Sequence, residues 1–69
     1  MTGLIQELVG KRIRVWSRGG ETTYTDDGVL DAFDGEWLRL DKGGEKLYFA
    51  LYNVRLIKPL EPVDSSADR

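Results

Sequence analysis

Short segments of alternating apolar and polar residues, the first three of them ended by glycine-containing turns, limit most strongly how this chain can fold. Alternation with a period of two is typical of strands with one buried face, and glycine pairs mark turns. The pattern predicts strands with the approximate ranges 11–18, 28–33, 37–41, 46–51 and 54–58. Residues 21–27 fit either a loop or an extension of two strands.

The segment before the first strand follows a different spacing. Its apolar residues recur at helical intervals, at Leu4, Ile5, Leu8 and Val9. Thr2 is suited to cap a helix at its start, and Gly10 is suited to end it. We expect a short α-helix, which is too brief to be stable alone and must lie across the strands.

Strands of this length enclose a core only when their sheet bends strongly. The predicted fold class is therefore all-β, with a short N-terminal α-helix followed by a five-stranded, strongly bent antiparallel barrel. Residues 1–60 are expected to form this domain. Residues 61–69 have little apolar content and are expected to form a disordered acidic tail.

The size of the chain limits its stability. A chain of 69 residues buries only roughly 60% of the surface that its unfolded form exposes. The sequence has no cysteine and no histidine, so disulfides are excluded and no cofactor or transition metal is expected. Association with copies of itself is the remaining source of stability.

Composition also bears on location and on partners. We expect a cytoplasmic protein with no membrane partner, because the sequence lacks cysteine, a signal-peptide pattern and a long apolar run. The net charge is −2, and residues 61–69 account for it, so residues 1–60 are neutral. A neutral domain does not attract polyanions as a whole, and any nucleic-acid site must be local.

One candidate for such a site is the first strand. Three arginines surround an aromatic ring on its outward face, which comprises Arg12, Arg14, Trp16 and Arg18. Cations and an aromatic ring can hold phosphates and a base. The alternative is a solvated face whose long side chains cover the tryptophan. No set of residues indicates catalysis, so we do not expect an enzyme.

The segment from residue 28 to residue 34 carries a family resemblance. Its pattern G-x-L-x-x-F-D, at Gly28, Leu30, Phe33 and Asp34, resembles the first Sm motif of Sm, LSm and Hfq-type proteins. The resemblance implies a small Sm-like barrel in a homo-oligomeric ring of about five to eight subunits. In such rings the fourth strand of one copy pairs with the fifth strand of the next.

The last two predicted strands are apolar on both faces, which independently favours such an interface. On the fourth strand alternate residues face opposite sides, and on the fifth Val54 and Leu56 face away from Ile57. The expected interface residues are Leu47, Tyr48, Phe49, Leu51, Tyr52, Val54, Leu56 and Ile57. The alternative is that packing within one chain covers both faces.

The resemblance also implies an RNA pocket, for which two registers are open. Strict counting places Asp34 on the family's aspartate, Glu36 on its stacking position and Leu38 on its asparagine, with Trp37 in the core. A shift by one residue puts Trp37 on the stacking position and Arg39 on the asparagine, and it points Leu38 inward. The candidate nucleic-acid residues of this hairpin are therefore Asp34, Trp37 and Arg39.

A second motif of the family departs from its usual pattern. Ala50 and Leu51 stand where the family has an arginine and a glycine. Two functions follow as expectations. The first is a non-catalytic ring that associates with RNA through a non-standard site. The second is a protein-interaction or scaffolding ring that has lost RNA binding.

Overall fold

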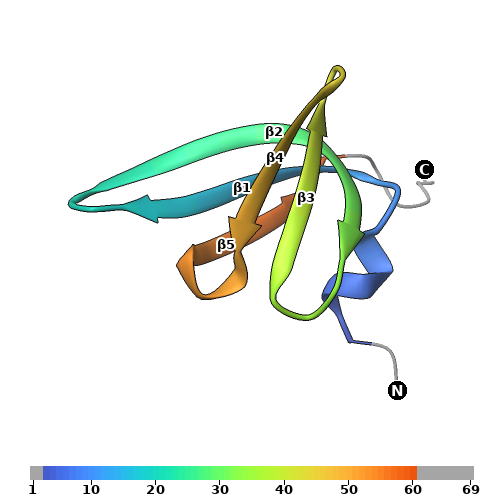
Figure 1. Cartoon of the computed structure of the whole chain (residues 1–69), viewed down its shortest axis with the longest axis horizontal. Coiled ribbons are helices and arrows are strands. Elements are labelled where there is room, and N and C mark those ends of the chain that lie inside the picture. The colour runs from blue at the N-terminus through green and yellow to red at the C-terminus, as the bar shows by residue number, and fades with distance from the viewer. Residues whose placement is uncertain (1–2, 61–69) are drawn as a thin grey trace, which may run out of the picture.

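Five antiparallel strands form a single sheet in the order β4-β3-β2-β1-β5 (Figure 1). The computed structural model describes residues 3–60. Its elements in chain order are η1 (Ile5–Leu8), β1 (Arg12–Gly19), β2 (Thr22–Phe33), β3 (Trp37–Lys42), β4 (Glu45–Ala50), η2 (Leu51–Asn53) and β5 (Val54–Pro59). The predicted cap at Thr2 and the predicted tail at residues 61–69 lie outside the described residues.

The prediction of an all-β chain with five antiparallel strands is confirmed. The largest difference in boundaries concerns residues 21–27, for which the sequence fitted either a loop or an extension of two strands. The structure has the extension, because β1 and β2 pair without interruption from Arg12 opposite Val29 to Gly19 opposite Thr22. The result is a long two-stranded ribbon that projects from the rest of the sheet (Figure 1).

The predicted N-terminal α-helix is wrong. Residues Ile5–Leu8 form a 3₁₀ helix of 4 residues, and the N–H of Glu7 bonds to the carbonyl of Leu4 three residues earlier. No side chain caps this turn, and Val9 is already extended, so the segment is too short for an α-helix. Within residues 3–60 no helix is long and apolar enough to cross a membrane.

The core lies on one face of the sheet and is small. Its fully buried large side chains come from β1, β2 and β3, and they are Ile13, Val15, Leu30, Leu38 and Leu40. Half-buried apolar residues of η1, β4, η2 and β5 pack around them. Because so few side chains leave water completely, the hydrophobic contribution to stability is modest.

A close approach between β2 and β3 shapes the sheet at Gly28. A Cβ atom at this position would lie 2.6 Å from the backbone oxygen of Asp41 and 3.0 Å from Cγ of Leu40. Only glycine allows this contact. The pairing register of β2 with β3 then shifts between Leu30 and Ala32, and this irregularity bends β2 further.

The sheet is not closed within the chain. β4 and β5 are its two edges and do not pair with each other, so the predicted barrel is open between them.

The predicted faces of β5 need correction. The β1–β5 register shifts beside Arg55, and Val54 and Ile57 therefore both pack against the core, whereas Leu56 lies opposite the outward Trp16. β4 ends at Ala50, so Leu51 and Tyr52 belong to η2 instead of the strand.

We expect Gly28→Ala to destabilise the protein. The added methyl group meets a backbone oxygen that cannot move without breaking the β2–β3 ladder. Overpacking of this kind costs about 1–3 kcal/mol of unfolding free energy. Urea denaturation measures the change, and Gly3→Ala is the control because an added methyl group there meets no atom within 4 Å. Equal stability of the two variants would contradict the close-approach argument.

Candidate functional site

The predicted basic stripe lies on the outward face of β1. Ile13, Val15 and Ser17 are buried on the core side, so Arg12, Arg14, Trp16 and Arg18 alternate to the other side. Arg12 and Arg18 are exposed, whereas Arg14 and Trp16 are half-buried. The structure therefore brings these four residues together on one surface, as the strand period requires.

Strand β5 enlarges this surface with residues that sequence reasoning did not assign to it. Lys58 lies opposite Arg14, and Leu56 lies opposite Trp16. Leu56 is 55% exposed, so the two apolar side chains form the middle of a surface ringed by cations. Only the pairing register of β1 with β5 reveals this neighbourhood. We call Arg12, Arg14, Trp16, Arg18, Leu56 and Lys58 the basic face.

One acidic residue on β2 is tied to the basic face. Arg14 donates from Nε to Oδ1 of Asp27 at 2.7 Å and from Nη2 to Oδ2 at 3.0 Å. These hydrogen bonds from Arg14 are the main reason that the pKa of Asp27 lies below its ordinary value. The two-point contact fixes the plane of the guanidinium group beside Trp16. Within residues 3–60, Arg12, Arg18 and Lys58 have no ion-pair partner.

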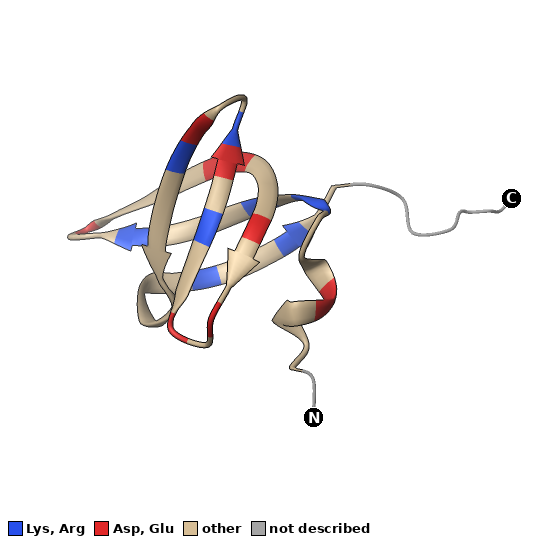
Figure 2. Cartoon of the chain, turned by 45° about the vertical axis from the view of Figure 1, so that its right-hand side comes forward, with Lys and Arg blue, Asp and Glu red and all other residues tan. Residues whose placement is uncertain are grey.

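Charge is divided between the two halves of the sheet (Figure 2). β1 and β5 contain arginine and lysine but no acidic residue. On the other half the cations are neutralised. Asp31 accepts from Nε of Arg39 at 2.9 Å and from Nζ of Lys46 at 2.7 Å, and Lys46 also reaches Asp41 at 3.2 Å. Local basic character is therefore confined to the β1–β5 half.

Asp34 has a structural part in the hairpin between β2 and β3. Its Oδ1 accepts hydrogen bonds from the backbone N–H groups of Glu36 and Trp37, both at 2.9 Å. The bond from Glu36 is the largest cause of the lowered pKa of Asp34, followed by the bond from Trp37. This carboxylate holds the turn, which leaves Oδ2 as its free acceptor.

The orientation of Trp37 agrees with the shifted register of the hairpin. Leu38 and Leu40 are fully buried, whereas Trp37 is 48% exposed and Arg39 shares its outward face. Trp37 and Arg39 line a hollow of about 250 Å³ with Ala32, Phe33, Asp34 and Tyr48. The predicted hairpin residues thus lie together, but Asp31 already pairs with Arg39, and β2 separates the hollow from the stripe on β1.

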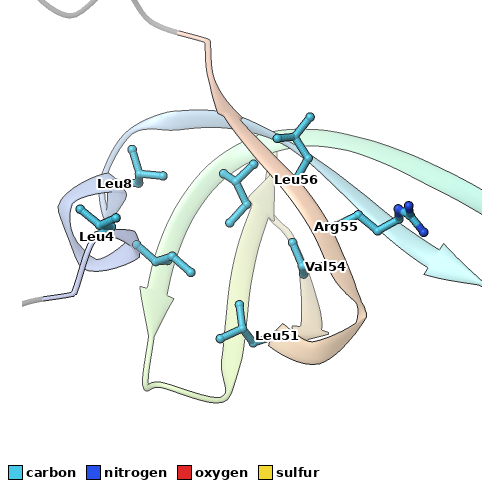
Figure 3. Close-up of a pocket in the computed structure, with 8 residues that line it drawn as sticks. Leu4, Leu8, Leu51, Val54, Arg55 and Leu56 are labelled. Carbon is cyan, nitrogen blue, oxygen red and sulfur yellow. The ribbon is translucent and has the colours of Figure 1, made fainter.

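Two further apolar hollows border the open side of the sheet. One, of about 420 Å³, lies between the β2–β3 hairpin and η2 and is lined by Gly35, Glu36, Trp37, Ala50, Leu51 and Tyr52. The other, of about 380 Å³, lies between η1 and β5 (Figure 3). Leu4 and Leu8 form its η1 side, and Val54 and Leu56 form its β5 side.

The residues predicted for the subunit interface divide into two groups. Leu47, Phe49, Leu51, Val54 and Ile57 are half-buried and pack against the core of their own chain. Tyr48, Tyr52 and Leu56 are 60%, 86% and 55% exposed. The first group serves intramolecular packing, and the second group supplies the apolar surface that one chain leaves uncovered.

Comparison with known proteins adds no assignment to this geometry. No family model, curated protein or solved structure matches the chain. Within residues 3–60 no group of three acidic side chains converges as a metal site.

We expect the protein to lose stability in acid. Asp27, Asp31, Asp34 and Asp41 all have pKa values below the ordinary value, because hydrogen bonds favour their charged forms. A lowered folded-state pKa stabilises the fold above the unfolded value of about 3.9, and this contribution disappears as the pH falls through the folded-state pKa. Urea denaturation between pH 7 and about pH 2 measures the unfolding free energy. Asp34→Asn should show a shallower acid loss, and an unchanged slope would contradict the assignment.

Proposed function

We propose that the protein is a non-catalytic Sm-like module that assembles into a homo-oligomeric ring through its edge strands and contacts RNA through the basic face. The observation that supports it most is that β4 and β5 are the two unpaired edges of one sheet. In the family that the sequence resembles, these two strands join neighbouring subunits.

The backbone groups at both edges point outward. The N–H of Leu51 donates to the carbonyl of Glu36, so odd-numbered residues of β4 face β3, and Lys46 and Tyr48 face the free edge. The N–H of Leu60 donates to the carbonyl of Arg12, so the backbone groups of Lys58 and Leu56 face β1, and those of Ile57 face the free edge. Each edge thus offers donors and acceptors that another strand can satisfy.

Apolar surface beside both edges supports the same proposal. The exposed Tyr48 lies in β4, and the exposed Tyr52 follows it in η2. The hollow between η1 and β5 borders the other edge. A neighbouring copy that adds β4 to β5 removes this surface from water. The sequence motif supports an Sm-like assignment too, because Gly28 provides the close approach that bends β2 and Asp34 holds the next hairpin.

RNA is the favoured ligand because of the basic face. Arg12, Arg18 and Lys58 surround Trp16 and Leu56 and have no ion-pair partner within residues 3–60. Phosphates pair with such cations, and a base can stack on the tryptophan. A ring repeats this face once per subunit, so weak contacts add up by avidity.

A protein ligand is the second candidate, and a separate observation favours it. The cations near Trp37 are neutralised, whereas the ring of this tryptophan borders two hollows and lies close to the exposed Tyr52. An aromatic surface without net positive charge suits a protein partner better than a polyanion.

The assembly is tested by a matched pair of variants. Tyr48→Pro removes an N–H that faces the free edge and leaves the β3 ladder intact, because edge strands tolerate proline at such positions. Tyr48→Thr removes the aromatic side chain but keeps the N–H. Native mass spectrometry should show a closed oligomer for the wild type and for Tyr48→Thr, and mainly monomer for Tyr48→Pro. A monomeric wild-type protein would contradict the proposal.

RNA contact is tested by charge removal on each half of the sheet. Arg18→Ala combined with Lys58→Ala should weaken binding to single-stranded RNA and reduce the salt slope by about 0.7 per lost contact. The control, Lys42→Ala, removes a cation that pairs with Asp26 at 3.0 Å and should leave binding unchanged. Fluorescence anisotropy over a salt series gives both quantities. Salt-independent binding, or none, would favour the protein-interaction alternative.

A further inference from the structure

The outer part of β2 is a third free edge of the sheet. β1 borders β2 along its whole ribbon, but β3 begins to pair with β2 only at Val29, opposite Asp41. The segment from Thr22 to Asp26 therefore has a neighbour on one side only. Figure 1 shows this ribbon extending away from β3 and β4.

The backbone of this segment directs alternate groups away from β1. The N–H of Leu30 donates to Lys11 at 3.0 Å, and the carbonyl of Leu30 accepts from Gly10 at 2.7 Å. Because the β1–β2 register is unbroken from here to the tip, even-numbered residues of β2 face β1. Thr23 and Thr25 consequently direct their N–H and C=O groups toward the open side.

The side chains of the segment favour pairing with another strand. Thr22, Thr23, Tyr24 and Thr25 are exposed and uncharged, and threonine and tyrosine are strong strand formers. The ring of Tyr24 lies across Gly19, where a Cβ atom would be 1.8 Å from Cε2 of the tyrosine. This contact stiffens the tip of the ribbon. Within the segment no charged residue protects the edge before Asp26, whose charge Lys42 neutralises.

We propose that this edge pairs with the same edge of a second copy, antiparallel and about a two-fold axis at Tyr24. The sequence Thr-Tyr-Thr is symmetric about this residue, so Thr23 meets Thr25 of the second copy and Tyr24 meets its own equivalent. In this register the edge-facing N–H and C=O groups of Thr23 and Thr25 all form hydrogen bonds with the second copy. The side chains of the two copies that lie on the same face of the sheet also remain on one common face. β3 ends at Lys42 and pairs with β2 only from Val29 onward, so the open side of Thr22–Asp26 is left for one further strand.

The pairing uses an edge distinct from β4 and β5 and goes beyond the proposed function. Its small size makes it weak between monomers. Several such contacts between two rings act together, so the pairing joins assemblies face to face or end to end by avidity.

Disulfide cross-linking tests the register, because the natural chain has no cysteine. In the proposed pair the two Tyr24 Cα atoms are about 4.5 Å apart, within the range that a disulfide spans. The two Thr23 Cα atoms are roughly 8–9 Å apart, which is too far. We expect oxidised Tyr24→Cys to form dimers roughly tenfold faster than Thr23→Cys. A mixture of Thr23→Cys and Thr25→Cys should also cross-link.

Backbone variants complete the test. Thr25→Pro removes one outward N–H without affecting the β1 ladder, and on the Tyr24→Cys background it should abolish the fast cross-linking. Thr25→Val keeps the N–H and should preserve it. Tyr24→Cys alone, with Thr25→Pro and with Thr25→Val is also made in the Tyr48→Pro background. Loss of the ring and loss of the ribbon contact are then observed separately. Equal rates for Tyr24→Cys and Thr23→Cys, or no effect of Thr25→Pro, would overturn the proposal.

Discussion

The whole structure depends on how a very small core is covered by one curved sheet. The five large, fully buried side chains lie on β1, β2 and β3, and the neighbouring elements add half-buried residues and the small Ala50. The sheet curves over this core where β3 approaches the backbone of β2 at Gly28. Within residues 3–60 no strand connects β4 to β5, so the part of the sheet that covers the core ends in two unpaired strands. The assembly that we propose would pair these edges and so cover their free backbone groups.

Strand number and turn positions could be predicted because alternation and glycine are local properties of the sequence. Leu38 and Leu40 show this, since their spacing alone places them in the core. Pairing registers could not be predicted, because they depend on contacts between distant segments. The irregularity beside Arg55 reversed the expected face of Val54, and the β1–β5 register placed Lys58 beside Arg14. The predicted α-helix failed because four residues give too few hydrogen bonds.

The candidate site illustrates why charge must be judged by its partners. Arg12, Arg39 and Lys46 each add one positive charge to the sequence. In the structure Asp31 accepts hydrogen bonds from both Arg39 and Lys46 and neutralises their side of the sheet, whereas Arg12 has no ion-pair partner within residues 3–60. The cations of β1 and β5 lie on strands without acidic residues, and the hydrogen bonds that Asp27 accepts come from Arg14. A neutral domain therefore has a basic half and a neutral, aromatic half. The proposed RNA contact uses the first, and the alternative protein contact uses the second.

Amide hydrogen exchange at the edges of β4 and β5 tests the central claim most directly. The amides of Tyr48 and Ile57 face away from the neighbouring strands of their own chain. If copies join through these edges, both amides exchange slowly, with protection that rises with protein concentration and approaches that of the buried Leu40. Exchange at the rate of an unprotected amide at every concentration would contradict the account.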